Sequence, residues 1–313
     1  MLLKGPLSYC TRIAGREGKG MRRLWLAAGL LTVAQGILCA HSQSSTPPIQ
    51  AAQLVREVVY NELHDHDSHG YWRYWIERHT SKESRLDEQV ETAEGPIARL
   101  NLTNGRSPDA QEKQAEQTRI NRLLNSPEEL ARHRQQYAED EKRIGRIVAL
   151  LPDAYLYEYD GEENGCHRLR FQPNPNYLAH SIEARIFHAM SGTLWVDARM
   201  KRMARLDGRL GENLEFGYGI LGRLYKGGWF QLRRTQVSAS DWKTERLEVH
   251  MNGRALVFKS IAHETSEIRG GFVPVPAGLN LAQGIALLDR AREQAQDPVQ
   301  PALYNPAALT VLR

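Results

Sequence analysis

The chain has 313 residues, with 41 lysines and arginines against 37 aspartates and glutamates, and a formal net charge of +4. Residues 1–40 contain six basic residues and one acidic residue, so the rest of the chain sums to −1. The positive excess therefore gives no indication of a nucleic-acid surface beyond residue 40. With 41% hydrophobic and 25% charged residues, the composition excludes a disordered chain and a multispan membrane protein.

The N-terminal segment is typical of a bacterial signal peptide. Arg22 and Arg23 precede the apolar run Leu24–Ala34, and the small residue Ala40 follows after a short interval. We expect cleavage near Ala40 and a periplasmic or secreted protein. The alternative is an inner-membrane anchor formed by residues 24–40, which is at the lower limit of length for a bilayer span. Either way, the sequence predicts export.

The remaining chain is long enough for one hydrophobic core. We expect a leader over 1–40, a linker over 41–48, one domain over 49–296 and a disordered tail over 297–313. Cys166 is the one cysteine beyond the leader, so no intrachain disulfide can form there and the fold must depend on apolar burial.

The domain begins with a predicted helix and a strand meander. Apolar residues recur at helical spacing, which predicts a helix lying against a sheet by one face; they are Leu54, Val55, Val58, Val59 and Leu63. An aromatic-rich strand follows over residues 71–78. Strand-like runs over 85–92 and 96–102 complete the meander.

Residues 107–151 differ from their surroundings and predict an inserted helical hairpin. Ser107-Pro108 and Ser126-Pro127 are both typical of a helix cap followed by proline in the first turn. The second helix has an apolar seam at seven-residue spacing, formed by Leu130, Tyr137, Ile144 and Leu151. We expect this hairpin to pack on its own sheet, with coiled-coil dimerisation as the alternative.

Strand signals return from Asp153 to about Pro276 and predict one antiparallel sheet. Alternation predicts strands that include Glu183–Met190, and Asn252-Gly253 predicts a tight hairpin between strands 246–251 and 254–261. A helix over Asn280–Gln296 then closes the domain, with apolar residues on one face.

A histidine cluster is the strongest local sign of catalysis. His64, His66 and His69 have spacing close to the His-x-His-x-Asp-His ligand run of metallo-β-lactamase-like hydrolases. Ser68 stands where that run has its aspartate, and the cluster lies between a helix and a strand instead of after a strand. A metal-dependent hydrolase using these histidines is therefore the alternative hypothesis, beside a solvated loop without a metal.

Other catalytic motifs are incomplete. Residues 217–222 match Gly-x-Gly-x-x-Gly without the strand and helix that a dinucleotide site needs. Ser240 and Lys243 have the spacing of penicillin-recognising enzymes without the companion motifs. We find neither a nucleophile elbow nor a phosphate loop, so the sequence favours a non-enzymatic protein without a cofactor.

A family resemblance rests on one hairpin and on the rhythm of the later strands. Residues 192–197 read Gly-Thr-Leu-Trp-Val-Asp, and residues 201–208 follow as a strand with cationic and aliphatic residues side by side. This pair resembles the central hairpin of outer-membrane lipoprotein-sorting proteins, the LolA/LolB-like superfamily. The resemblance covers residues 50–103 and 153–276. It implies an α+β fold in which a curved antiparallel sheet, an unclosed half-barrel, holds acyl chains on a concave face covered by helices.

Strand alternation suggests which residues line that face. We expect an apolar groove formed by Trp72, Tyr74, Ile76, Leu194, Val196, Leu247, Val249 and Met251. The competing interpretation for each residue is plain core. The leading hypothesis is an exported, non-enzymatic protein that binds a lipid, an acylated peptide or another apolar partner, including a lipoprotein, with transient membrane contact and no nucleic acid. A second alternative is an envelope interaction module that docks a partner through the 107–151 hairpin.

Overall fold

The computed structural model describes residues 50–64, 70–216, 222–255 and 264–296. The leader over 1–40, the linker over 41–48 and the tail over 297–313 lie outside these ranges, so their assignments stay predictions. Among the described helices, none combines the length and the apolar character that a bilayer span requires.

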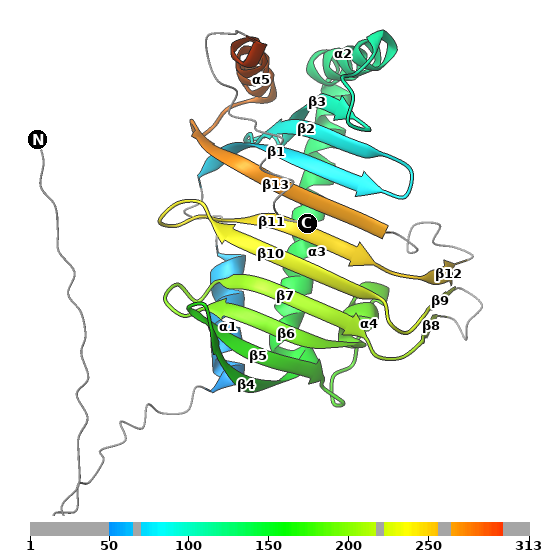
Figure 1. Ribbon diagram of the computed structural model, residues 1–313, viewed down its shortest axis with the longest axis vertical. Coiled ribbons are helices and arrows are strands. Elements are labelled where there is room, and N and C mark those ends of the chain that lie inside the picture. Colours follow the sequence, from blue (N-terminus) through cyan, green and yellow to red (C-terminus); the bar gives the residue numbers. More distant parts are fainter. Residues whose placement is uncertain (1–49, 65–69, 217–221, 256–263, 297–313) are drawn as a thin grey trace, which may run out of the picture. The chain divides into compact units, whose positions relative to one another are not determined.

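The fold is built on one ten-stranded antiparallel sheet (Figure 1). The strand order is β3-β2-β1-β13-β11-β10-β7-β6-β5-β4, and the end strands β3 and β4 do not pair with each other. This confirms the predicted unclosed antiparallel sheet. The strands are β1 (Tyr71–Thr80), β2 (Ser84–Val90), β3 (Ile97–Thr103), β4 (Tyr155–Glu163), β5 (Cys166–Pro173), β6 (Met190–Asp197), β7 (Met203–Leu210), β10 (Trp229–Gln236), β11 (Trp242–His250) and β13 (Glu264–Val275).

A smaller sheet and five helices complete the described part of the chain. The strands β8 (Leu214–Phe216), β9 (Gly222–Leu224) and β12 (Gly253–Ala255) form a three-stranded sheet. The helices are α1 (Ala51–Leu63), α2 (Ala110–Asn125), α3 (Pro127–Ala154), α4 (Ile182–His188) and α5 (Leu281–Gln296). The predicted N-terminal helix, inserted helical hairpin and C-terminal helix are thus all confirmed.

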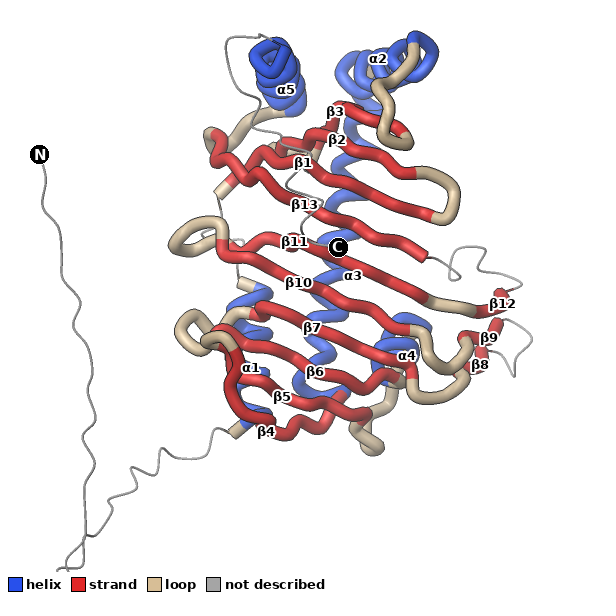
Figure 2. Tube along the Cα trace, viewed as in Figure 1, coloured by secondary structure: helices blue, strands red, loops and turns tan. Residues whose placement is uncertain are grey.

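Helices α1, α3 and α4 lie against one side of the large sheet, which we call the helical face; the other side is the open face (Figure 2). Two apolar cores form where helices meet strands. In the first core, α1 and the C-terminal end of α3 cover the strands from β4 to β7. Its fully buried members are Val55, Val58, Ala154, Leu169, Leu194 and Val196.

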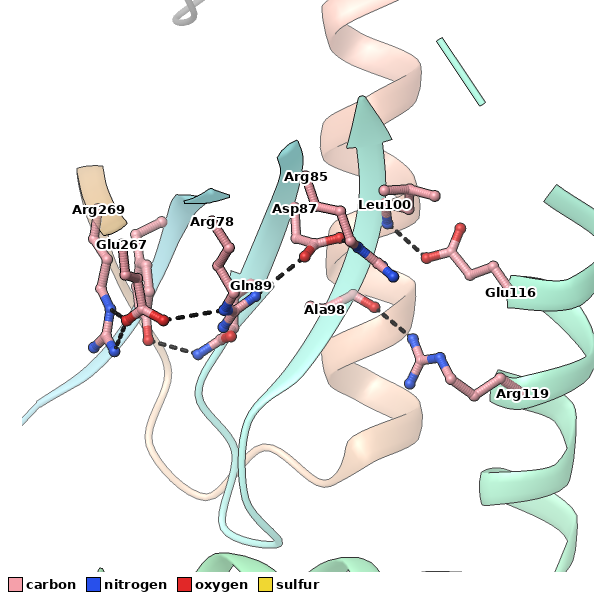
Figure 3. Close-up of polar contacts among 11 residues, drawn as sticks. Arg78, Arg85, Asp87, Gln89, Ala98, Leu100, Glu116, Arg119, Glu267 and Arg269 are labelled. Carbon is pink, nitrogen blue, oxygen red and sulfur yellow. Dashed lines mark hydrogen bonds and ion pairs between the residues drawn. The ribbon is translucent and has the colours of Figure 1, made fainter. Parts of the chain in front are cut away.

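The second core lies at the opposite end of the sheet, where α2 and α5 pack beside β2 and β3. It contains Val90, Ile97, Ile120, Leu123, Leu281, Ile285 and Leu288. Helix α2 also covers the edge of β3: the Leu100 N–H donates to the Glu116 carboxylate at 2.6 Å, and the Ala98 carbonyl accepts from Arg119 at 3.0 Å (Figure 3). Side chains of α2 therefore satisfy backbone groups of an end strand that would otherwise invite pairing with another chain.

Two of the predicted helix caps differ in outcome. The Ser126 hydroxyl accepts from the Glu129 N–H and begins α3, as expected. The cap of α2 is Asp109 instead of Ser107, because Asp109 and Glu112 form a reciprocal capping box.

Two strand predictions were wrong. Residues 183–188 of the predicted strand Glu183–Met190 belong to α4, and Met190 begins β6. The helix forms because the Ser181 hydroxyl accepts from the Ala184 N–H at 3.0 Å and caps its first turn. The predicted Asn252-Gly253 hairpin does not pair the strands on either side: β11 pairs with β10 and β13, whereas β12 pairs with β9. A tight-turn signal describes the local backbone alone and cannot choose between strand partners. Residues 256–261 of that prediction lie outside the described ranges.

Candidate functional site

One row of side chains crosses the helical face and changes from apolar to charged. Cα pairing runs from Leu194 through Leu206, Leu232 and Leu247 to Glu267 on β13, and Glu267 pairs in turn with Arg78 on β1. Leu194 and Leu206 are buried in the first core. Leu232 and Leu247 are half-buried. The apolar half of the row thus extends past the part that the first core buries.

Helix α3 crosses this face (Figure 1), and its two ends pack in the two cores. Leu151 is 5% exposed in the first core, and Leu130 packs against the second. Between them, Tyr137 and Ile144 are 38% and 57% exposed. Because residues seven apart lie on nearly the same side of a helix, all four belong to one stripe. The apolar seam therefore joins two cores and leaves Ile144 largely exposed, whereas burial raises the pKa of the partly exposed Tyr137 to about 12.

The charged end of the row is a continuous network over β13, β1 and β2 (Figure 3). The Arg78 guanidinium donates to Glu267 at 3.0 Å and to Asp87 at 3.1 Å. Arg269 donates to Glu267 at 2.7 Å, and Arg85 donates to Asp87 at 3.2 Å. Three guanidinium groups thus share two carboxylates, which leaves this network with one excess positive charge.

Tyr74 lies beside this network as a buried, neutral phenol. The Gln89 amide donates to its hydroxyl at 2.6 Å, and the Arg269 guanidinium carbon lies 5.9 Å from its ring centre. Burial raises the pKa of Tyr74 to about 12. The Phe272 ring lies 5.1 Å away, between centroids. Tyr74 therefore packs between Phe272 and the arginines of this network.

A second charged group connects α1 to the strands. Glu62 accepts two hydrogen bonds from Arg202, at 3.1 and 3.0 Å, and one from the Met203 N–H at 2.9 Å. Arg234 also forms an ion pair with Glu62. Burial raises the pKa of Glu62, but the two arginines and the hydrogen bonds outweigh it and hold the pKa below its usual value. Glu62 thus links α1 to Arg202 and Arg234.

The predicted groove residues do not line one hollow. Leu194 and Val196 are part of the first core under α1 and α3. Met251 and half-buried Val249 belong to a third cluster with residues of α4, β8 and β9. Trp72, Tyr74 and Ile76 form a fourth cluster with Val237 and Phe272, and Leu247 is half-buried. For the buried residues the core interpretation describes their packing, and a ligand-binding role stays a prediction.

The predicted metal ligands lie mostly outside the described ranges. His66 and His69 are not among the described residues. His64 ends α1, where its Nδ1 lies 2.8 Å from the Tyr60 carbonyl and its ring stacks on Tyr60. Within residues 50–64, 70–216, 222–255 and 264–296, no group of three His, Cys, Asp or Glu side chains could hold a metal ion.

The sequence did not reveal Arg78, Glu267 or Arg269 as members of one site. Alternation places each on the correct side of its own strand, but β1 and β13 are separated by most of the domain in sequence. Their juxtaposition depends on the β1–β13 pairing, in which Arg78 is opposite Glu267. No local pattern specifies that pairing.

Comparison with known proteins does not assign the chain to a family. No family model and no curated protein matches the chain. Among solved structures, a DUF1329 family protein from Desulfovibrio piger has 12% identity and a TM-score of 0.26, covering 74% of this chain and 95% of its own. MucB in complex with MucA(peri) has 9% identity and a TM-score of 0.21, covering 75% of this chain and 96% of its own. Scores this low do not establish a shared fold.

Proposed function

We propose that this protein is an exported, non-enzymatic binding protein that holds the acyl chain of a lipid or an acylated peptide on its helical face. The observation behind the proposal is that the leucine row continues from half-buried Leu232, which packs against the first core, to half-buried Leu247, which does not. The exposed Ile144 and Tyr137 on α3 supply apolar surface on the same side of the sheet. An acyl chain between them would complete the burial of both surfaces.

The energetics favour such a ligand. Each buried methylene contributes about 0.8 kcal/mol, so eight of them contribute about 6 kcal/mol before the cost of association. The arginines beside the apolar row would attract an anionic headgroup at the end of the chain. Arg269 and Arg234 are half-buried there, in contact with Glu267 and Glu62 respectively.

Fluorescent fatty-acid titration tests the proposal. The purified chain should bind the probe, and Ile144→Glu and Leu247→Glu should each weaken binding at least tenfold, since a carboxylate would be buried against the acyl chain. Ala138→Glu is the matched control, because Ala138 is exposed on α3 but lies off the seam. Native mass spectrometry of protein purified from its host should show a bound lipid. A ligand-free mass together with no probe uptake would refute the proposal.

Docking of a partner by the helical hairpin stays a second alternative, and both helices of the hairpin also contribute to the cores. Helix α3 supplies Leu151 and Ala154 to the first core, and α2 supplies Ile120 and Leu123 to the second. Deleting the hairpin would therefore open both cores, and partner binding must be tested by substitutions at its exposed residues. The metal-dependent hydrolase stays an alternative, for which zinc analysis after chelator-free purification is the test.

A further inference from the structure

The open face of the sheet has a hollow of about 450 Å³ over β6, β7 and β10. Because side chains alternate between faces, the hollow lies on the side opposite the leucine row. The side chains around it are those of Ser191, Thr193, Asp207, Arg209, Trp229 and Gln231. No part of the proposed acyl-binding surface contributes to it.

The strand register sets these side chains in two parallel rows. Ser191 pairs with Arg209, which pairs with Trp229. In the next row, Thr193 pairs with Asp207, and Asp207 pairs with Gln231. The hollow is therefore bordered by one indole ring, one carboxylate, one guanidinium, one amide and two hydroxyls. Its size falls within the usual range for a small-molecule site.

Existing contacts hold the carboxylate in place. Arg205 donates through Nε to Asp207 at 2.9 Å, and the Gln231 amide donates to the same carboxylate at 3.2 Å. Arg205 is itself fixed, since its guanidinium carbon lies 4.4 Å from the ring centre of Trp195. The Asp207 acceptor is thus pre-organised, which reduces the entropy cost of binding a ligand.

Arg209 and Trp229 supply the complementary chemistry. The Arg209 side chain is exposed and forms no hydrogen bond or ion pair with any described residue. The half-buried Trp229 ring lies nearly parallel to His250, at 14°, with 6.0 Å between centroids. The electron-rich face of an indole attracts polarised C–H bonds, whereas carboxylate, amide and guanidinium groups bind hydroxyls.

We propose that this hollow binds a pyranose unit of a glycan. A pyranose presents a C–H face that fits the Trp229 ring, and it has hydroxyls that can donate to Asp207 and accept from Arg209. Asp207 is already paired with Arg205 and accepts from Gln231, so its remaining acceptor position suits a single ligand hydroxyl beside the Arg209 donor. A neutral polyhydroxyl ligand matches this paired arrangement of acceptor and donor.

Calorimetric titration with chitotetraose, cellotetraose and maltotetraose tests the proposal. At least one should bind the purified chain with a dissociation constant of about 1 mM or tighter. Trp229→Ala and Arg209→Ala should each weaken that binding at least tenfold. Arg233→Ala is the matched control and should bind as the unaltered chain does, because Arg233 is exposed on the same face but does not border the hollow. Circular dichroism should show that each variant folds.

The Asp207→Asn variant distinguishes a glycan-binding site from an anion-binding site. Loss of the charged acceptor should weaken tetrasaccharide binding, whereas it would strengthen binding of inorganic phosphate. Failure of all three tetrasaccharides to bind, or unchanged binding by Trp229→Ala, would overturn the proposal. Phosphate binding that increases in Asp207→Asn, with no tetrasaccharide binding, would identify an anion site and also overturn it. Fatty-acid uptake by Trp229→Ala should be unchanged, since that surface is on the other side of the sheet.

Discussion

Glu62 on α1 and Arg202 next to β7 form a buried two-point ion pair, with Oε1 to Nε at 3.1 Å and Oε2 to Nη2 at 3.0 Å. Arg234 on β10 adds a second guanidinium to the same carboxylate. The side chains of Glu62 and Arg202 are 8% and 7% exposed. One residue near the end of the first helix therefore fixes that helix to two strands.

Glu62→Gln should lower the free energy of unfolding by about 3 kcal/mol, because breaking a buried ion pair leaves uncompensated charge. Arg202 and Arg234 would then both lose the carboxylate that they contact. Urea unfolding followed by circular dichroism measures the change. Glu57→Gln on the exposed side of α1 is the matched control and should shift the free energy by less than about 0.5 kcal/mol. Equal effects from the two substitutions would contradict a special role for Glu62.

The same pair predicts a pH dependence. The folded-state pKa of Glu62 lies below its usual value of 4.5, so the folded protein binds fewer protons than the unfolded chain in that range. The stabilisation is fully present above the unfolded pKa and is lost as the pH falls through the folded pKa. The difference in unfolding free energy between the unaltered chain and Glu62→Gln should therefore shrink between pH 6 and about pH 3.

Comparison with Glu62→Gln at each pH isolates this effect from the titration of other carboxylates. The Glu57→Gln control should follow the unaltered chain throughout. A difference that stays constant down to the lowest pH at which the protein remains folded would show that the charge of Glu62 does not provide the stabilisation.

The sequence predicts those parts of the fold whose contacts lie within one element or between two neighbouring elements. Of the five apolar residues whose helical spacing predicted the buried face of α1, Leu54, Val55, Val58 and Val59 are buried, whereas Leu63 at the end of the helix is 36% exposed. The hairpin formed by β6 and β7 was likewise identified, since both strands and their turn are contiguous. Local periodicity is sufficient in such cases because the pattern and the contact involve the same short segment.

Less of the candidate site could be predicted from the sequence. Arg78 and Glu267 meet because β13 returns beside β1, and this pairing closes a loop of most of the domain. Apolar and polar residues alternate in the α4 segment as they do in a strand, but the Ser181 cap stabilises a helix there. Long-range register and competing local signals were therefore the main sources of error, and both depend on tertiary context.

Gly192 and Gly208 are opposite each other on β6 and β7. Because they have no side chain, the Phe171 and Phe230 rings can pack against them. A Cβ at Gly208 would collide with the Phe230 ring, and one at Gly192 with a backbone carbonyl. Gly208→Ala should lower the free energy of unfolding by about 1–3 kcal/mol, the usual cost of overpacking. Urea unfolding measures it.

Gly211→Ala is the control for this substitution, since a Cβ there would meet no atom within 4 Å. It should be neutral or slightly stabilising. Phe230→Leu combined with Gly208→Ala should recover part of the loss, because the smaller side chain relieves the collision. A Gly208→Ala variant as stable as Gly211→Ala would show that the strands can move apart without cost.

Two similar substitutions on the apolar seam of α3 should have very different effects on the free energy of unfolding. Leu151→Ala should lower the free energy of unfolding by about 2–5 kcal/mol, because it opens a cavity in the first core. Ile144→Ala should change it by less than about 0.5 kcal/mol, because Ile144 is 57% exposed and Leu151 is 5% exposed. Thermal unfolding of both variants in lipid-free protein measures the contrast.

Addition of the fatty-acid probe should raise the thermal unfolding midpoint of the unaltered chain more than that of Ile144→Ala, because a ligand that binds the folded state stabilises it more the tighter it binds. A large loss for Ile144→Ala without any ligand would mean that the middle of α3 packs on the sheet, and the proposed acyl-binding surface would then be core.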